Sequence, residues 1–242
     1  MIVQRFPDHE TMSRQAADYL VRLIEAKPDA LLCLGSGDTP IATYRQLVLM
    51  VDAGFVDVSA CTFVGLDEWV GMDATVAGSC TQSLYLELFD PLDLRPDQIH
   101  VFNARATDLA AECRRMDALI DERGGFDLLL VGMGVNGHIA LNEPGSSFTA
   151  GCHVSELHET TISVGQKYFA GPTALTQGIT VGLRHVSSAH NVMMLVSGDR
   201  KAAILNDAIT GPVTEAVPAS LLQTHPQAVV MVDAAAARLL PN

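Results

Sequence analysis

Two hydrophobic patterns alternate along the chain. In one, apolar residues recur every three or four positions, which is typical of one face of an amphipathic helix. In the other, they form short unbroken runs, which are typical of a strand buried on both faces. The first pattern predicts helices over residues 10–26, 41–50, 79–89, 107–123 and 160–170, a helix that ends at 209, a helical turn at 218–223 and a last helix over 234–240. The second predicts strands over 30–34, 61–66, 99–102, 128–131, 178–183, 192–196 and 228–232.

Because strands and helices alternate throughout, the sequence predicts an α/β fold. We expect a Rossmann-like, mostly parallel sheet with helices on both faces. No repeat, low-complexity segment or linker divides the chain, so residues 1–242 are expected to form a single domain. The polar segment 153–159 fits neither pattern and is left unassigned.

Chemically active side chains follow the predicted strand at 128–131. The loop after it is rich in glycine and contains Asn136, His138 and Glu143, and Pro144 then ends any regular structure. In open α/β sheets, ligands bind beyond the carboxyl ends of the strands. We therefore place the candidate catalytic centre in this loop, although His138 taken alone would more often be a structural loop histidine.

Residues 132–137 of this loop match GxGxxG, the pattern of dinucleotide-binding proteins. That pattern binds a pyrophosphate where it opens a helix. Here Pro144-Gly145 stops a helix soon after the glycines, and the match lies in the middle of the chain rather than in a first strand–helix–strand unit. A nicotinamide cofactor is therefore not expected.

A second glycine loop joins the first predicted strand to the second predicted helix. It spans residues 35–40, with the sequence GSGDTP. Pro40 suits the first turn of the helix, and Thr39 or Asp38 suits its N-cap. A helix N-terminus after such a loop can hold a phosphate, but the same loop can equally be a plain tight turn.

Two adjacent carboxylates, Asp67 and Glu68, follow the predicted strand at 61–66, with the single tryptophan, Trp69, beside them. A carboxylate at the carboxyl end of a strand could serve as a general base. The alternative is a helix cap next to a solvated acid. Both interpretations stay open from these residues alone.

The chain has 242 residues and a formal net charge of −13. Nucleic acids and anionic membranes favour patches of Lys and Arg, so neither is an expected partner. An anionic substrate would need local donors, such as backbone N–H groups and one or two lysines. No apolar run reaches the roughly 18 residues of a membrane span, and the N-terminal MIVQRFPDHE does not have the pattern of a secretory signal.

The cysteines are five in number and widely spaced, with no CxxC pair. This spacing argues for reduced thiols and against a disulfide framework or a zinc site. We therefore expect a cytoplasmic protein without a bound metal. The five are Cys33, Cys61, Cys80, Cys113 and Cys152.

Three segments together resemble the glucosamine-6-phosphate deaminases, and most closely the subgroup of galactosamine-6-phosphate isomerases. They are 35–40 (GSGDTP), 66–71 (LDEWVG) and 137–145 (GHIALNEPG). The resemblance extends from the first predicted helix to the last predicted strand. Its third segment is highly specific. The related 6-phosphogluconolactonases share the fold and the Gly-His pair, but typically not Asn-Glu-Pro-Gly.

The resemblance implies an enzyme that converts a 2-amino-2-deoxyhexose 6-phosphate into a ketohexose 6-phosphate and ammonia, with no metal or organic cofactor. Galactosamine 6-phosphate would give tagatose 6-phosphate, and glucosamine 6-phosphate would give fructose 6-phosphate. The sugar ring must open, a proton must pass from C2 to C1, and the amine must leave as water adds.

The resemblance also implies a role for each matching residue. Asp67 corresponds to the carboxylate that moves the C2 proton, and His138 to the imidazole that opens the ring, a role that suits a side chain able to gain and lose a proton near neutral pH. Glu143 corresponds to the carboxylate that orients this histidine. The implied phosphate-binding residues are Gly35, Ser36, Gly37, Thr39, Lys167 and Lys201.

Two positions depart from the family pattern. Many members have Asp where this chain has Asn136, so Glu143 would be the main carboxylate partner of His138. Asp38 stands in the phosphate loop where Gly, Ser or Ala is more usual. A carboxylate close to a phosphate would cost on the order of a kcal/mol or more, so we expect the Asp38 side chain to turn away and cap the following helix.

Two alternative functions remain: a 6-phosphogluconolactonase-type hydrolase and a non-catalytic sugar-phosphate sensor. The residues that would distinguish galacto from gluco substrates at C4 are not evident; 72–79 and Ser146-Ser147 are candidates. Longer relatives are allosteric hexamers. This chain has no evident C-terminal extension, so we expect at most a small homo-oligomer.

Overall fold

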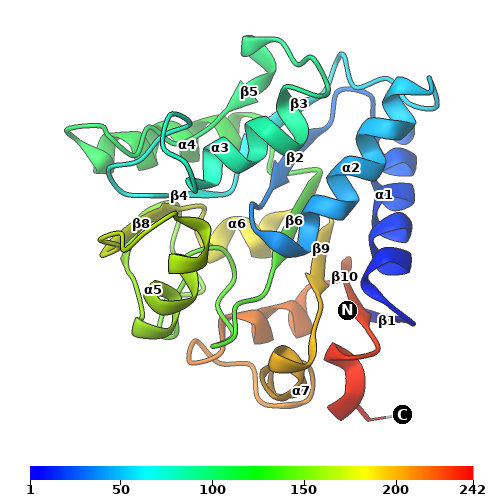
Figure 1. Ribbon diagram of the computed structural model, residues 1–242, viewed down its shortest axis with the longest axis vertical. Helices are drawn as coiled ribbons and strands as arrows, with labels where there is room; N and C mark the ends of the chain where they lie inside the picture. Colours follow the sequence, from blue (N-terminus) through cyan, green and yellow to red (C-terminus); the bar gives the residue numbers. More distant parts are fainter. Residues whose placement is uncertain (242) are drawn as a thin grey trace.

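The computed structural model describes residues 1–241 (Figure 1). Its centre is a seven-stranded sheet in the order β1-β10-β9-β6-β2-β3-β5, and every neighbouring pair is parallel. The predicted mostly parallel α/β sheet is therefore confirmed. Its strands are β1 (Ile2–Phe6), β2 (Leu31–Leu34), β3 (Thr62–Gly65), β5 (Ile99–His100), β6 (Leu128–Gly132), β9 (Val192–Val196) and β10 (Ala228–Asp233).

Helices cover both faces of this sheet. Along β9, Met193 and Leu195 point into one hydrophobic core, whereas Met194 and Val196 point into the other. Strands buried on both faces need apolar residues at every position, which explains the unbroken runs in the sequence. One face is covered by α1 (His9–Ala26), α2 (Asp38–Asp52), α3 (Cys80–Leu84) and the π-helix η1 (Tyr85–Phe89). The other is covered by α4 (Leu109–Glu122), α6 (Leu183–Ser188), α7 (Ala202–Thr210), η5 (Pro218–Thr224) and η6 (Ala236–Leu239).

A second, three-stranded antiparallel sheet lies beside the first (Figure 1). It consists of β4 (Asp67–Trp69), β8 (Gln177–Thr180) and β7 (His153–Glu156), in the order β4-β8-β7. The predicted strand at 178–183 belongs here and not to the parallel sheet, and it ends before α6 begins at Leu183. The unassigned polar segment forms β7, in which the one fully buried residue is Ser155 and only Val154 is apolar, so it shows no apolar run.

Other differences from the predicted elements concern edges and ends. The edge strand β1 was missed because its five residues are half-buried or exposed and show neither hydrophobic pattern. Helix α2 begins at Asp38 rather than at residue 41. The helix predicted over 160–170 is instead a short helix, α5 (Glu159–Gly165), followed by the 3-10 turn η3 (Gln166–Tyr168).

The carboxylate of Glu68 joins β4 to α3. Its side chain is 0% exposed. Its Oε1 accepts from the backbone N–H of Trp69 at 2.8 Å and of Cys80 at 3.0 Å, and its Oε2 accepts from that of Thr81 at 2.8 Å. Glu68 therefore caps α3. One interpretation of the sequence predicted a helix cap at this pair of carboxylates, but the carboxylate that caps the helix is buried. Asp67, its neighbour in β4, lies on the opposite side of the strand, since successive side chains of a strand alternate between its two sides.

No helix within residues 1–241 is long and apolar enough to cross a membrane. All five cysteines are buried free thiols in this part of the chain.

Replacing Glu68 by alanine should lower the free energy of unfolding by about 3 kcal/mol or more, because three buried N–H groups lose their acceptor. Urea unfolding of Glu68→Ala and Glu68→Gln would test this. Gln keeps one oxygen acceptor and most of the volume, so its loss should be smaller. If wild type and Glu68→Ala were equally stable, water would replace the Glu68 carboxylate at α3 without loss, and the prediction would be wrong.

Candidate active site

A cavity of about 990 Å³ opens where the parallel strands end. Its lining comes from the loops after β2, β3, β6 and β9, from α3 and from the α5–η3 segment. This volume suits a small-molecule ligand. Eight of the ten candidate residues line it: Gly35, Ser36, Gly37, Thr39, Asp67, His138, Lys167 and Lys201. The other two, Asn136 and Glu143, lie beside His138 outside the lining.

The loop after β2 delivers the chain to the N-terminus of α2. Gly37 is the N-cap, with φ of +104°, a left-handed conformation that favours glycine. Because Gly37 has no side chain to cap the helix, the first N–H groups of α2 remain available to an anion in the cavity. The predicted cap by Thr39 or Asp38 is wrong, since both residues are already inside the helix.

Asp38 pairs with Lys167 across the cavity mouth. Its Oδ2 lies 2.5 Å from Lys167 Nζ, which also stands 4.8 Å from the centre of the Tyr168 ring. The expectation that Asp38 would cap the helix is therefore replaced by an ion pair between the glycine loop and η3. Both side chains are about half exposed, so the pair is a weak tie that solvent and ligands can compete for.

Lys201 is the second lysine of the cavity and ends the turn η4 (Asp199–Lys201) after β9. Burial and the positive charge of Lys167 lower the pKa of Lys201 to about 8, although Asp38 and Asp233 act in the opposite direction. A buried lysine whose charge is disfavoured by a second lysine forms a site that a phosphate would stabilise. This end of the cavity is thus the one suited to an anion.

Asp67 lies in the same cavity, at the point where the chain leaves the parallel sheet for the antiparallel one. Burial raises the pKa of Asp67 to about 7, the negative charge of Glu68 adds to this rise, and the Cys80 thiol partly offsets it. A carboxyl group with a pKa near neutrality can both take up and return a proton, which is what a general base needs.

His138 is held by three neighbours. Its Nδ1 lies 3.4 Å from Glu143 Oε2 and 3.2 Å from the Thr161 hydroxyl, and its backbone N–H donates to Asn136 Oδ1 at 3.2 Å. The Asn136 amide also donates to Glu143 Oε2 at 2.9 Å. The structure therefore brings the three predicted residues of this loop together.

Glu143 is the anionic member of this group. Burial acts to raise the pKa of Glu143, but the hydrogen bond and charge of His138 outweigh it and lower that pKa to about 2. Hydrogen bonds involving Thr161 and Asn136 add to the lowering. Near neutral pH Glu143 is thus a fixed carboxylate, and it can orient the imidazole without exchanging protons itself.

The glycine pattern at 132–137 has a local explanation. A Cβ atom at Gly134 would lie 2.3 Å from the His138 ring, so only glycine allows the imidazole to fold back over the loop. The loop continues into an isolated bridge between Ile139 and Asn142 and not into a helix. These glycines therefore shape the histidine loop, and the prediction that they do not form a dinucleotide site agrees with this geometry.

Comparison with known proteins places this geometry in a family. Residues 7–231 match the family model described as glucosamine-6-phosphate isomerases/6-phosphogluconolactonase. The chain belongs to this family.

Several known proteins are similar to this chain, to different degrees. The glucosamine-6-phosphate deaminase of Lachnoclostridium phytofermentans is 38% identical over 92% of this chain and 95% of its own. AgaI of Escherichia coli (strain K12), provisionally named a deaminase, is 38% identical over 96% of this chain and 91% of its own. A solved monomeric glucosamine-6-phosphate deaminase has a TM-score of 0.96 at 35% identity, over 99% of this chain and 100% of that one. The 6-phosphogluconolactonase of Trypanosoma brucei, at 20% identity and a TM-score of 0.79 over 99% of this chain and 98% of its own, shares the fold.

Several cavity residues of this family member carried no signal in its sequence. Thr161 lies in α5 and contacts His138. His9 contacts the segment 35–40, because its Nε2 lies 2.8 Å from the Thr39 carbonyl oxygen. Both are distant in sequence from any motif, so only the tertiary contact identifies them. Of the segments suggested for sugar selectivity, Gly78 and Ser79 line the cavity, whereas Ser146-Ser147 do not.

The carboxyl ¹³C signal of Asp67 should titrate with a pKa of about 7 in the ligand-free protein, so that Asp67 is mostly protonated below pH 7 and ionised above it. In Glu68→Gln the midpoint should move to lower pH, because the neighbouring negative charge that disfavours ionisation is gone. NMR of aspartate-labelled protein, assigned with Asp67→Asn, measures both. A midpoint near that of an exposed aspartate would contradict the buried position of Asp67.

Proposed function

We propose that this protein is an amino-sugar-6-phosphate deaminase, which converts glucosamine 6-phosphate or galactosamine 6-phosphate into the ketohexose 6-phosphate and ammonia. One observation carries the proposal. A carboxyl group poised near neutrality and a carboxylate-oriented imidazole face the same cavity, whose other end presents two lysines and an open helix N-terminus. Family membership and the deaminase names of relatives at 33–38% identity support it.

The phosphate would bind at the end of the cavity formed by the glycine loop and the lysines. N–H groups of residues 36–39, at the N-terminus of α2, offer hydrogen bonds, and Lys201 and Lys167 offer charge, whereas the N–H of Gly35 already donates to the Leu130 carbonyl at 3.0 Å. To bind the phosphate, Lys167 would have to break its ion pair with Asp38 or contact Asp38 and the phosphate together. Anchoring the substrate at its far end fixes the reacting carbons near Asp67 and His138 and reduces the entropic cost of reaching the transition state.

The ring would open at His138. Its imidazole passes the proton of the C1 hydroxyl to the ring oxygen, which breaks the C1–O5 bond and produces the open-chain aldehyde. Glu143 is proposed to hold the imidazole in the orientation that this transfer needs, with Asn136 fixing Glu143 in turn. Because Asn136 is neutral, Glu143 is the only carboxylate that we assign to this histidine.

Asp67 would carry the isomerisation. It removes the proton at C2 of the open-chain aldehyde, and an enolamine forms as the C1 carbonyl oxygen gains a proton. Return of the proton to C1 leaves a protonated imine at C2, and its extra proton is released as ammonia leaves. Water adds to this imine and ammonia leaves, so that substrate and water give ketose phosphate and ammonia. A base with a pKa near 7 is suited to a proton that is taken from one carbon and given back to another.

The proposal also covers the location and assembly of the protein, the alternative reaction and the sugar selectivity. We propose a cytoplasmic protein that forms at most a small homo-oligomer; reduced, buried thiols support the location, and a monomeric solved relative supports the small size. Lactone hydrolysis is less favoured, since the solved lactonases that resemble the chain are 16–20% identical and share the fold alone. Discrimination at C4 would fall to groups near Gly78 and Ser79, which line the same cavity as Asp67.

The variant Asp67→Asn should lower kcat for ammonia release by at least about 1,000-fold, because the amide cannot accept the C2 proton. Substrate affinity should change little, since Asn keeps the size of Asp. Ammonia release from both amino-sugar phosphates, measured above pH 7 without added metal, tests this beside substrate binding by calorimetry. Asp90→Asn, an exposed position outside the cavity, is the matched control.

Each outcome of this assay identifies a different function. Turnover by wild type and by Asp90→Asn, but not by Asp67→Asn, supports the proposal, and the ratio of kcat/KM values identifies the preferred sugar. Full turnover by Asp67→Asn contradicts the role of Asp67. Tight binding with no turnover in the wild type favours a sensor, and hydrolysis of 6-phosphogluconolactone instead favours the lactonase alternative.

Replacing Asp38 by Asn should tighten the binding of inorganic phosphate by about three- to fivefold. The change removes a carboxylate that competes with phosphate for Lys167, and an exposed ion pair of this kind is worth up to about 1 kcal/mol. KM should fall with it while kcat stays the same, as expected for a group that acts equally on substrate and transition state. Asp52→Asn, exposed at the far end of α2, is the control. Weaker phosphate binding would instead show that Asp38 positions Lys167.

A further inference from the structure

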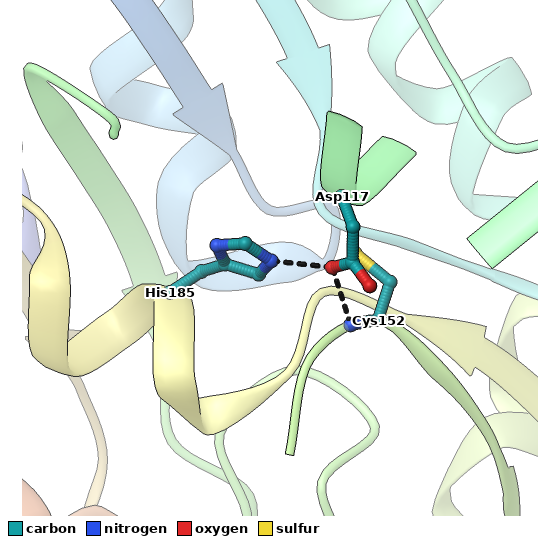
Figure 2. Close-up of side chains that lie close together, drawn as sticks. All are labelled: Asp117, Cys152 and His185. Atoms are coloured by element: carbon teal, nitrogen blue, oxygen red, sulfur yellow. Dashed lines mark hydrogen bonds and ion pairs between the residues drawn. The ribbon is translucent and has the colours of Figure 1, made fainter. Parts of the chain in front are cut away.

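A cluster of three potential metal ligands lies outside the candidate active site (Figure 2). Asp117 comes from the middle of α4, Cys152 immediately precedes β7, and His185 comes from α6. One carboxylate oxygen, the Cys152 sulfur and one imidazole nitrogen all lie within 4.8 Å of one another. None of these residues lines the active-site cavity.

Contacts within the cluster hold its three residues next to one another. His185 Nε2 is 2.5 Å from Asp117 Oδ1, which also accepts the backbone N–H of Cys152 at 2.9 Å. The side chains of His185 and Asp117 are 1% and 25% exposed, so the imidazole is buried while the carboxylate leaves a path from solvent. Three separate elements thus hold the group rigidly with one open side.

We propose that Asp117, Cys152 and His185 form a binding site for one zinc ion or a similar borderline divalent cation, with water as the fourth ligand. A sulfur, an imidazole nitrogen and a carboxylate oxygen are the three ligand types that zinc takes in proteins, whereas magnesium and calcium prefer oxygen alone. Tetrahedral zinc separates its N and O ligands by roughly 3.3 Å. The carboxylate would therefore have to move back from His185 by less than 1 Å to admit the ion.

One positive charge stands close to this site. Arg184 Nη2 lies 3.4 Å from Asp117 Oδ1 and 3.3 Å from Asp121 Oδ2. Arg184 is 42% exposed and makes its second ion pair with Asp121, so it can release Asp117 without losing all its partners. The negative charges of a thiolate and a carboxylate would balance the divalent ion, which removes the electrostatic need for Arg184 at Asp117.

Metal binding here would stabilise the small antiparallel sheet. The ion would join α4, which packs on the parallel sheet, to the residue before β7 and to the helix after β8. β8 pairs in turn with β4, in which Asp67 faces Thr180. The sequence did not indicate such a site, because its cysteines form no pair at metal-binding spacing and the three ligands are far apart along the chain.

Equilibrium dialysis against zinc, with thermal unfolding of the same samples, tests the proposal on the full chain. We expect one zinc per chain in the wild type and a Tm that rises with zinc concentration, because the ion binds the folded state. Cys152→Ser and Asp117→Asn should weaken binding at least about 100-fold, since even residues that only support metal ligands often cost 10- to 100-fold. Cys113→Ser, one helical turn from Asp117 but outside the ligand set, should bind as the wild type does.

Two further measurements locate the ion. Asp67→Asn should keep the zinc, which separates this site from the active-site cavity. Cobalt(II) in place of zinc should give a thiolate charge-transfer band that Cys152→Ser lacks, and this reports on the ligand even where a variant loses stability. Absence of stoichiometric zinc binding by the wild type, or zinc binding and a cobalt band that persist in Cys152→Ser, would overturn the proposal.

Discussion

A parallel sheet buried on both faces restricts where this protein can carry out chemistry. The inner strands β2, β6, β9 and β10 use nearly all their side chains for the two hydrophobic cores, as the alternation along β9 shows. Polar groups are therefore confined to the ends of the strands, and at the carboxyl ends four loops converge on one cavity. The glycine loops, Asp67, His138 and Lys201 share a site because the sheet leaves them no other place.

Within this restriction, Glu68 provides the local contact on which the candidate base depends. The carboxylate of Glu68 satisfies three backbone N–H groups where β4 meets α3. This bonding turns Glu68 inward and Asp67 toward the cavity, since neighbouring residues of a strand point to opposite sides. It also places a negative charge beside Asp67. The same interaction thus fixes the position of the candidate base and contributes to its raised pKa.

Burial affects the charged groups of the site differently because their partners differ. Glu143 is buried, but His138 and neutral donors surround it, so its pKa falls to about 2. Asp67 is buried beside another carboxylate, so its pKa rises to about 7. Lys201 is buried near Lys167, so its pKa falls to about 8. The site therefore combines a permanent anion beside the cavity with two groups in the cavity whose pKa values lie near neutrality, a separation typical of sites that transfer protons.

The sequence alone determined the fold class, most strands and helices, and the loops that form the site. Continuous apolar runs are a direct consequence of double-sided burial, and glycine-rich loops with Asp67 and His138 mark the strand ends. The edge strand β1, the polar strand β7 and the antiparallel pairing of β8 were decided by tertiary structure, since half-buried edge strands leave little hydrophobic pattern and the apolar run of β8 does not specify which strands it pairs with. The partners of Asp38 and the grouping of Asp117, Cys152 and His185 also depended on the fold. Side chains far apart along the chain meet only when helices and sheets pack, and no local spacing encodes that meeting.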